Sequence, residues 1–560
     1  MIRNTKKNHF LKWVKLTTYH LPLITILGVS PVQAAKSYDY LIQGALIYDG
    51  EAIEAFTGDV ALTGDKIEAV GNLKGAVARK TIDGRGLVLS AGFIDAHTHS
   101  DFNPLIYPDL ANKVMQGVTT EIVGNCGMSA APVLGAHQDQ IRGVWAREGV
   151  NIQDKLSWHS FKEYREALES SGMNTNFIAL VGHGNLRAAV VGFAPRQASL
   201  GEIQEMRRLL RESMQDGAAG ISYGLIYLPG IFAPEEELVD LCEEAGKNSG
   251  LCAFHMRSEG GGVIDALEET LRIGEKARTG VEISHLKAAG KANWEKIQEV
   301  FKRIEQGRLK GQRITADVYP YTGSFAELGV VLPDALYQRE DRVAYFRNPL
   351  NRSELLQELR AYYEGRSMKW DSVMVAATNH KKYWKYEGKT IRNIARLTDK
   401  EPEQFLIEIL ADTQFEVSAY YFSQSEEVVS AVVKKPYTAI GSDSIADGSR
   451  KPHPRAFGTF PKVLGEYVRE RKELSLGQAL WKMTVLPAEQ FYLKNRGKIK
   501  AGNFADLVLF DAKEIKDRAT YEKPKEMPKG VRWVFVNGEP AVQEGKPTGK
   551  KNGRFLKPSE

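Results

Sequence analysis

The chain has 560 residues, which is too long for one ordinary domain and suits a barrel of about 250 residues or more with accessory parts. Hydrophobic residues make up 43% and charged residues 26%, an ordinary composition for a water-soluble globular protein. The formal net charge is +5, but the first 34 residues hold five basic and no acidic side chains. The remainder has 70 basic and 70 acidic residues and no basic run, so its charge gives no reason to expect a nucleic-acid partner.

The first 34 residues have the three parts of a secretory signal peptide. Basic residues precede a short apolar stretch, 21–29, which is followed by Val32 and Ala34 at the cleavage positions. The apolar stretch is too short to span a bilayer, and no Cys stands at the cleavage site to carry a lipid. The alternative is an ordinary basic N-terminal helix, which would normally include acidic residues. We therefore expect an exported protein, periplasmic or secreted, without a stable membrane anchor.

Three cysteines occur in the chain: Cys126, Cys242 and Cys252. An exported protein stabilised by several disulfides would carry more of them, and an even number. We therefore expect its stability to come from a large core. Cys242 lies in a helical stretch and Cys252 opens a strand, which predicts two buried small side chains. A disulfide between them stays open as the alternative.

Short strands with Gly-rich turns are predicted at both ends of the chain. They cover 38–89 at the start and 502–510 and 531–538 near the end, where period-two alternation and Asp-Gly turns occur. Neither end has enough strands for a core of its own. We therefore predict one small β-sandwich domain formed by 35–90 and 490–560.

Between these ends, short apolar segments alternate with amphipathic helices, the pattern of βα units on a parallel sheet. Eight such segments predict a closed (β/α)8 barrel of the TIM type over 91–489. The last two are separated by more than a hundred residues, which predicts an inserted subdomain at about 322–430. The predicted strands are GFIDAHTH (92–99), TEIVGNC (120–126), NFIALVGHG (176–184), GAAGISYG (217–224), LCAFHMR (251–257), VEISHLK (281–287), RITADVYPY (313–321) and TAIGSDS (438–444).

Metal-binding side chains stand at the carboxyl ends of five predicted strands, the end at which a parallel barrel forms its active site. The first strand ends in His97 and His99, two residues apart and therefore on the same side. A single histidine there would more often be packed in the core, but the joint arrangement favours a metal site. Histidine, thiolate and carboxylate together suit Zn²⁺ better than Mg²⁺ or Ca²⁺. The six donors are His97, His99, Cys126, His255, His285 and Asp443.

The motifs that carry these residues resemble those of the D-aminoacylase (N-acyl-D-amino-acid deacylase) family of the amidohydrolase superfamily. The similarity covers roughly 38–556, nearly the whole chain after the leader. GNCG followed by ISHLK is more specific to the family than the HxH pair. The motifs are GFIDAHTHSDF, GVTTEIVGNCGMSAAPV, GLIYLPG, HMRSEG, ISHLKAAG, GSDS and KPHPRAFGTFPKVLG, with ADLVLF, VNG and GKPTG at the end.

The resemblance implies two neighbouring zinc sites, one tight and one weaker. Many amidohydrolases bridge two metals with a carboxylated lysine from the fourth strand, but GAAGISYGLIYLPG contains no Lys here. This absence agrees with the family's use of a cysteine. The tight site would be formed by Cys126, His255 and His285, and the weaker one, bridged by Cys126, by His97, His99 and Asp443.

Zinc lowers the pKa of a water ligand to about 7, and Asp443 is the predicted general base for that water and proton donor to the leaving amine. The alternative for Asp443 is a turn or helix N-cap residue, because Ser-Asp runs are common in turns. The resemblance implies that Tyr227 polarises the scissile carbonyl, with packing in an apolar run as its alternative. Four further residues are predicted substrate contacts, each with a structural role equally open: Lys287, which would pair with a carboxylate, Tyr319, Ser324 and His183.

The sequence therefore predicts zinc-dependent hydrolysis of the linear amide bond of N-acyl-D-amino acids, small-molecule substrates, to a carboxylate and a free D-amino acid. The first alternative is a cyclic-amide or dipeptide hydrolase of the same superfamily. The second is a barrel that has lost catalysis and serves as a binding scaffold. Retention of all six donors argues against the scaffold.

Overall fold

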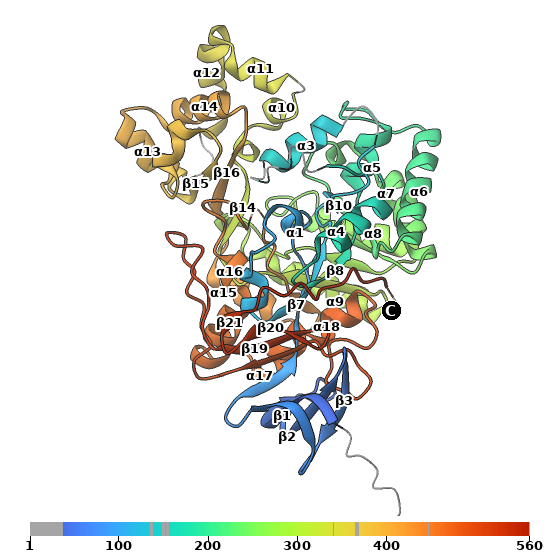
Figure 1. Cartoon of the computed structure of the whole chain (residues 1–560). Helices are drawn as coiled ribbons and strands as arrows, with labels where there is room; N and C mark the ends of the chain where they lie inside the picture. Colours follow the sequence, from blue (N-terminus) through green and yellow to red (C-terminus); the bar gives the residue numbers. More distant parts are fainter. Residues whose placement is uncertain are drawn as a thin grey trace, which may run out of the picture.

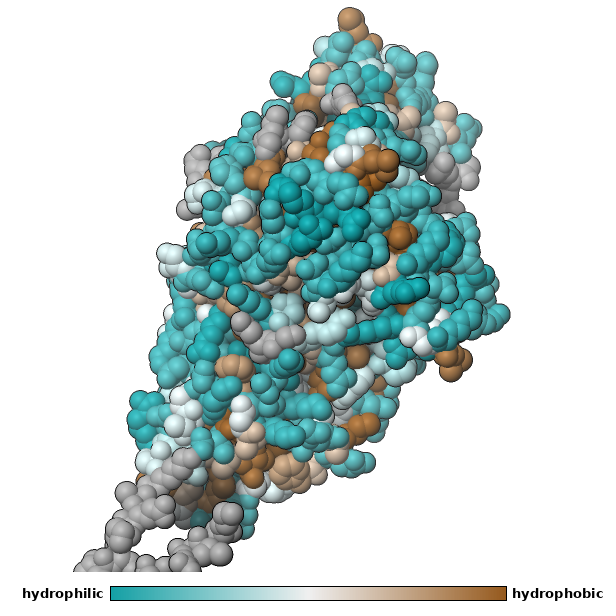
Figure 2. All heavy atoms as spheres, turned by 90° about the vertical axis from the view of Figure 1, so that its right-hand side faces the viewer, coloured by the Kyte–Doolittle hydropathy of each residue, from teal (hydrophilic) through white to brown (hydrophobic). Residues whose placement is uncertain are grey.

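The computed structural model of the chain describes residues 37–134, 138–147, 150, 152, 156–339, 341–364, 369–445 and 447–558 (Figure 1). The predicted signal peptide, 1–34, lies outside the described residues. No helix in the described part is long and apolar enough to cross a membrane. On the face drawn in Figure 2, hydrophilic residues dominate and the apolar ones form small separated groups.

Eight parallel strands form a closed ring, which confirms the predicted barrel. The first and last strands are joined by hydrogen bonds from Ala96 N to Ile440 O (3.3 Å) and from His99 N to Ser444 O (2.8 Å). Nearly every strand residue is buried, as expected for a parallel sheet covered on both faces. The strands are β6 (Phe93–Asp95), β7 (Val118–Val123), β8 and β9 (Asn176–Ala179 and Val181–Gly182, parts of the third strand), β10 (Gly220–Gly224), β11 (Leu251–His255), β12 (Val281–Ile283), β13 (Ile314–Val318) and β17 (Thr438–Ile440).

Helices surround the ring, and most of the longer ones are amphipathic and bury one face against it. In α6 (Leu200–Gln215), the side chain of Ser199 caps the first turn while Glu202 bonds back to it, and Met206 and Leu210 face the core. The other barrel helices are α1 (Asn103–Ile106), α2 (Asn112–Met115), α3 (Gln138–Arg147), α4 (Phe161–Ser171), α5 (His183–Val190), α7 (Glu235–Lys247), α8 (Val263–Ala277), α9 (Lys296–Leu309), α15 (Glu426–Lys434), α16 (Arg455–Lys462), α17 (Leu476–Met483) and α18 (Val485–Gln490).

Strands from both ends of the chain form one nine-stranded sheet. The prediction of a β-domain shared by the two ends has this arrangement. The two ends meet where β5 pairs antiparallel with β18. Hydrogen bonding makes the sheet continuous, and it branches at β1, which pairs with β4 along its first part and with β5 along its second. The strands are β1 (Ser37–Tyr48), β2 (Phe56–Thr63), β3 (Lys66–Gly71), β4 (Val77–Asp83), β5 (Val88–Ala91), β18 (Leu507–Phe510), β19 (Val531–Val536), β20 (Glu539–Gln543) and β21 (Lys546–Pro547).

A separate subdomain stands between β13 and β17, at the opposite end of the molecule from β1–β3 (Figure 1). It has its own hydrophobic core, which includes Leu355, Ile394 and Phe405. Its three strands form an antiparallel sheet in the order β14-β16-β15. Its elements are β14 (Gly323–Glu327), α10 (Asp334–Tyr337), α11 (Arg342–Arg347), α12 (Arg352–Tyr363), β15 (Val373–Thr378), α13 (Ile391–Thr398), α14 (Pro402–Thr413) and β16 (Val417–Phe422).

A disulfide joins Cys242 of α7 to Cys252 of β11. The expectation of two separate buried thiols was therefore wrong, and the alternative holds. The spacing of the two cysteines in the sequence does not reveal the disulfide, because they come together only when α7 packs against β11. Cys126 is free and buried.

Candidate metal centre and active site

The six predicted donors come together at the carboxyl ends of the barrel strands, in two groups that share Cys126. Within each group, one donor atom per residue lies within 4.8 Å of the others. The Cys126 Sγ atom is 3.4 Å from His97 Nε2 and 3.3 Å from His285 Nε2, so the thiol lies between the groups. All six side chains are buried. One group is His97, His99, Cys126 and Asp443, and the other is Cys126, His255 and His285.

Three of these donors have left-handed backbone conformations. The φ angles are 52° at Cys126, 38° at His285 and 49° at Asp443. Such conformations cost of order 1–3 kcal/mol for residues other than glycine and occur preferentially at functional sites. Each of the three stands just past the end of its strand, so this local bend, rather than strand alternation, aims the side chain.

Glycines allow the Cys126 loop to lie directly against β10. A side chain on Gly224 would collide with the carbonyl oxygen of Cys126, and a Cβ on Gly127 would lie 2.5 Å from the backbone nitrogen of Gly224. Gly127 also has a φ of 73°, which glycine adopts without strain. The residue shared by the two groups therefore comes from the loop after β7, while β10 supplies no lysine.

The donor set fits a metal ion. Neither ring nitrogen of His255 has a hydrogen-bond partner within the described residues, and neither has His99 Nδ1, although all three atoms are buried. Burial lowers the pKa of His255 well below its usual value and that of His99 to about 4, so both rings are neutral and offer lone pairs. Buried polar atoms without partners are costly, and a bound cation would supply the missing interaction.

Asp317, at the end of β13, positions two of the donors. Its carboxylate accepts from His97 Nδ1 at 2.9 Å and from the backbone nitrogen of His285 at 2.9 Å. Burial opposes a charge on His97, but the Asp317 carboxylate outweighs it and raises the pKa of that imidazole. The contact leaves His97 Nε2 facing Cys126, as carboxylate–histidine pairs at metal sites do. Sequence reasoning missed Asp317, although it lies within the predicted seventh strand.

Asp443 faces two of the candidate donor histidines, His97 and His99, and a cation. Its Oδ1 lies 3.5 Å from His97 Nε2 and 3.4 Å from His99 Nε2, and its Oδ2 lies 2.8 Å from Arg455 Nη1. Burial would raise the pKa of Asp443, but the positive charge of Arg455 holds it well below its usual range. Asp443 is therefore an ionised carboxylate. Arg455 was missed as a site residue, although it lies in the KPHPRAFGTFPKVLG motif.

The segment around Asp443 is fixed by a buried ammonium group. Lys113 Nζ donates to the hydroxyls of Ser442 and Ser444, at 2.9 and 2.8 Å, and to Asp95 at 2.7 Å. Asp95 also accepts from the backbone nitrogen of Ser442. These contacts hold both neighbours of Asp443. Lys113 could not be predicted as a site residue, because it lies in the short helix α2 and not at a strand end.

A cavity of about 240 Å³ opens on the donors. Four of the residues predicted to act on substrate line it: Tyr227, Lys287, Tyr319 and Ser324. The ring of Tyr227 packs edge-on against His255, with centroids 4.9 Å apart. The inserted subdomain supplies one wall through β14 and the 3-10 helix η5 (Leu328–Val331).

Lys287 lies beside a carboxylate that sequence reasoning missed. Its Nζ is 2.5 Å from Glu259 Oε1 and 2.8 Å from His285 Nδ1. Although burial opposes ionisation of Glu259, the charge of Lys287 lowers the pKa of that carboxyl. Glu259 stands in HMRSEG, four residues after His255, so the motif contained the signal.

His183 does not line this cavity, in contrast to the expectation that it contacts substrate. It is the first residue of α5, fully buried, with Nε2 2.8 Å from Glu237 Oε1. Glu237 in turn pairs with Arg187. The ring of His183 packs against Tyr223 in the barrel wall. Its charge partners lie on the surrounding helices, which a strand-end position in the sequence does not reveal.

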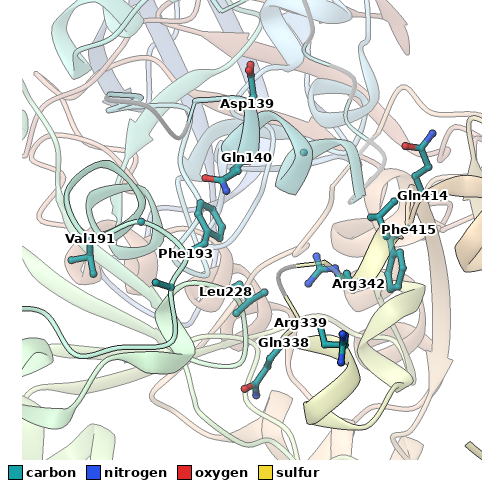
Figure 3. Close-up of a pocket in the computed structure, with 14 residues that line it drawn as sticks. Asp139, Gln140, Val191, Phe193, Leu228, Gln338, Arg339, Arg342, Gln414 and Phe415 are labelled. Carbon is teal, nitrogen blue, oxygen red and sulfur yellow. The ribbon is translucent and has the colours of Figure 1, made fainter. Parts of the chain in front are cut away.

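A larger hollow, of about 590 Å³, lies between α3, the segment after α5 and the inserted subdomain (Figure 3). Phe193 and Leu228 line it on the barrel side, and Phe415 lines it on the other. None of the predicted site residues lines this hollow. The donors therefore identify the smaller cavity as the candidate active site.

Fold and site together define a metal-dependent hydrolase, and comparison with known proteins gives its family. The chain belongs to the Amidohydrolase family, whose model matches residues 80–250 and 388–542. D-aminoacylase of Alcaligenes xylosoxydans xylosoxydans is 35% identical over 93% of this chain and 98% of its own length. N-acyl-D-aspartate deacylase of the same organism is 34% identical over 95% and 97%. These relatives place the chain in the D-aminoacylase branch of the family.

Solved structures agree with this placement. A crystal structure of D-aminoacylase matches with a TM-score of 0.78 and 34% identity, covering 93% of this chain and all of that one. N-acyl-D-glutamate deacylase from Bordetella bronchiseptica, complexed with zinc and a phosphonate inhibitor, matches with a TM-score of 0.78 and 30% identity over 93% and 100%.

Proposed function

We propose that the protein hydrolyses the amide bond of N-acyl-D-amino acids at a zinc centre, releasing a carboxylate and a free D-amino acid. The observation that carries this proposal is the meeting, in one cavity, of two donor groups sharing Cys126 with two cations, Lys287 and Arg455. The donors can hold the metal, and the cations can hold a carboxylate. D-aminoacylase and the N-acyl-D-aspartate and N-acyl-D-glutamate deacylases are its relatives over nearly their whole length.

The residues divide into a tight zinc site and a weaker one. Thiolate and imidazole are preferred zinc ligands, and the weaker set adds one carboxylate. When bound, zinc acts as a Lewis acid and lowers the pKa of water to about 7. The tight site would use Cys126, His255 and His285, and the weaker one His97, His99 and Asp443, with Cys126 shared.

Asp443 is the proposed general base and acid. Because it is ionised, its carboxylate can take a proton from the attacking water and later give it to the leaving amine. Tyr227 lies at the cavity beside His255, where its hydroxyl would donate to the oxygen of the scissile carbonyl.

The α-carboxylate of the substrate would be held by Lys287 and Arg455. Both cations lie over the ring of Tyr319, at 5.7 and 4.6 Å from its centroid, so they face one small volume. Tyr319 and Ser324 would add hydrogen bonds there. A carboxylate fixed at this point orients the α-carbon, so one hand of the substrate presents its amide to the metal.

The proposed location is outside the cytoplasm. The basic and apolar leader, 1–34, supports export. The Cys242–Cys252 disulfide also supports it, because such bonds persist in oxidising compartments and are rare in the cytosol.

One assay separates this function from its rivals. Release of carboxylic acid is measured from N-acetyl-D- and N-acetyl-L-amino acids, beside dihydroorotate and hydantoin, with the zinc-loaded protein. We expect turnover of the D-series alone. Preference for a cyclic amide or for the L-series would overturn the proposal, and no turnover of any substrate would favour the scaffold.

A further inference from the structure

We infer that the substrates carry a neutral, apolar D-side chain, and that this site rejects the acidic side chains named in two of its relatives, the aspartate and glutamate deacylases. This inference rests on the proposed function and narrows its substrate class. It follows from how charge is distributed over the cavity wall.

The two cations of the cavity are already matched by two carboxylates. Lys287 Nζ lies 2.5 Å from Glu259, and Arg455 Nη1 lies 2.8 Å from Asp443. Apart from histidines, these are the only basic residues that line the cavity among the described residues. The α-carboxylate common to all N-acyl amino acids would occupy both of them. A second carboxylate would therefore find no cation of its own.

Apart from the donors, Glu259 and the residues already assigned to the substrate, the cavity lining is apolar except for Ser423 and Tyr421. The loops after β7 and β10 contribute Met128 and Ile226, and the inserted subdomain contributes Phe325, Ala326 and Val330. Tyr421 also lines this region, but its hydroxyl donates to the carbonyl of Glu327 at 2.8 Å. A charged group placed against such a wall would be buried without a partner, which is strongly unfavourable, whereas an alkyl or thioether chain would gain by burial.

A substrate series of equal length tests the inference. N-acetyl-D-methionine, N-acetyl-D-glutamine and N-acetyl-D-glutamate differ mainly in polarity and charge at the end of the side chain. We expect kcat/KM to fall in that order, with glutamate at least about a hundredfold below methionine because its charge stays unpaired. Hydrolysis of glutamate within threefold of methionine would overturn the inference while leaving deacylation intact. Failure to cut any of the three, with cyclic amides or L-substrates cut instead, would refute the proposed function.

A matched pair of variants tests the wall itself. Val330 is half-buried on η5, where a longer side chain can reach the cavity. Val330→Lys adds a cation, and Val330→Met adds similar length without charge. We expect the lysine variant to reduce the preference for methionine over glutamate by at least about tenfold, and the methionine variant to keep it. An equal change of preference in both variants would show that length, not charge, excludes the acid, and would overturn the inference.

Discussion

At the scale of single residues, the position of Asp443 decides what it can do. One carboxylate oxygen faces two metal-binding histidines, and the other pairs with Arg455. Burial would raise the pKa of Asp443, but the guanidinium of Arg455 lowers it and keeps the carboxylate ionised. The oxygen that faces the histidines therefore lies where the proposed mechanism needs a base, and it carries the charge needed to accept a proton.

Asp443→Asn should lower kcat by about a hundredfold or more, because the amide has nearly the same size but cannot accept the proton. The zinc held by Cys126, His255 and His285 should change little. Steady-state kinetics and elemental analysis of the same preparation check both statements. Activity within a few-fold of wild type would exclude Asp443 as the general base.

The sequence predicted the six donors but not the residues that orient them. Donors follow the carboxyl ends of barrel strands, and strand order is readable from alternating apolar segments. Asp317, Glu259 and Arg455 act through contacts that form only when distant segments meet in the barrel. A charged residue on a helix such as Lys113 looks like a solvated surface group until burial is known.

Cys126→Ala should lose the tightly bound zinc and nearly all activity while the barrel stays folded. Burial and the carboxylate of Asp443 raise the pKa of this thiol well above its usual value, so the thiolate needs a cation beside it. No lysine on β10 can replace its charge. Zinc per protomer and the circular dichroism spectrum are the measurements.

The paired cysteines supply the control for that variant. The double change Cys242→Ala and Cys252→Ala removes a disulfide that includes none of the donors and should cost about 2–4 kcal/mol of stability. It should retain zinc and turnover below its melting temperature. Wild-type zinc content in Cys126→Ala, or loss of zinc in the double variant, would contradict the assigned site.

At the scale of elements, the loop from Ser442 to Ser444 positions the Asp443 carboxylate at the end of β17. Left-handed backbone at Asp443 is held on both sides by serine hydroxyls that accept from Lys113. GSDS predicted a turn, and it was the alternative interpretation of Asp443. The structure gives Asp443 a left-handed backbone, which aims its carboxylate at His97 and His99. Its left-handed geometry could not be predicted, because only a few per cent of residues other than glycine adopt that conformation, even though Asp does so more often than most.

The double change Ser442→Ala and Ser444→Ala should lower kcat by about tenfold, since it removes two hydrogen bonds to a charged group. KM should change little, because Lys287 and Tyr319 stand on other elements. Ser213→Ala is the matched control: Ser213 is equally buried, but its hydroxyl bonds to Leu209 O within α6. A melting temperature lowered below the assay temperature, or an equal loss of kcat in the control, would indicate general destabilisation instead of loop positioning.

At the scale of the whole molecule, the barrel places its cavity beneath a subdomain inserted late in the chain. The β-domain occupies the other end (Figure 1). The order of strands and helices predicted this organisation, because chain order alone specifies a βα barrel and its interruption. It did not predict that β14 and η5 would form a cavity wall, since that depends on how the subdomain docks.

The mature protein should begin near Ala35 and lie outside the cytoplasm. The first 34 residues carry all of the excess positive charge, and β1 begins at Ser37, two residues after the expected new N-terminus. Cleavage there would leave the β-domain intact and a chain with equal numbers of acidic and basic residues.

The Cys242–Cys252 disulfide would form after export. N-terminal sequencing of protein from fractionated native cells, with thiol alkylation in denaturant and chelator before and after reduction, measures both features. We expect a new N-terminus near Ala35 and one alkylated cysteine before reduction and three after it. An intact Met1 or Ile2, or three reactive thiols without reduction, would contradict export.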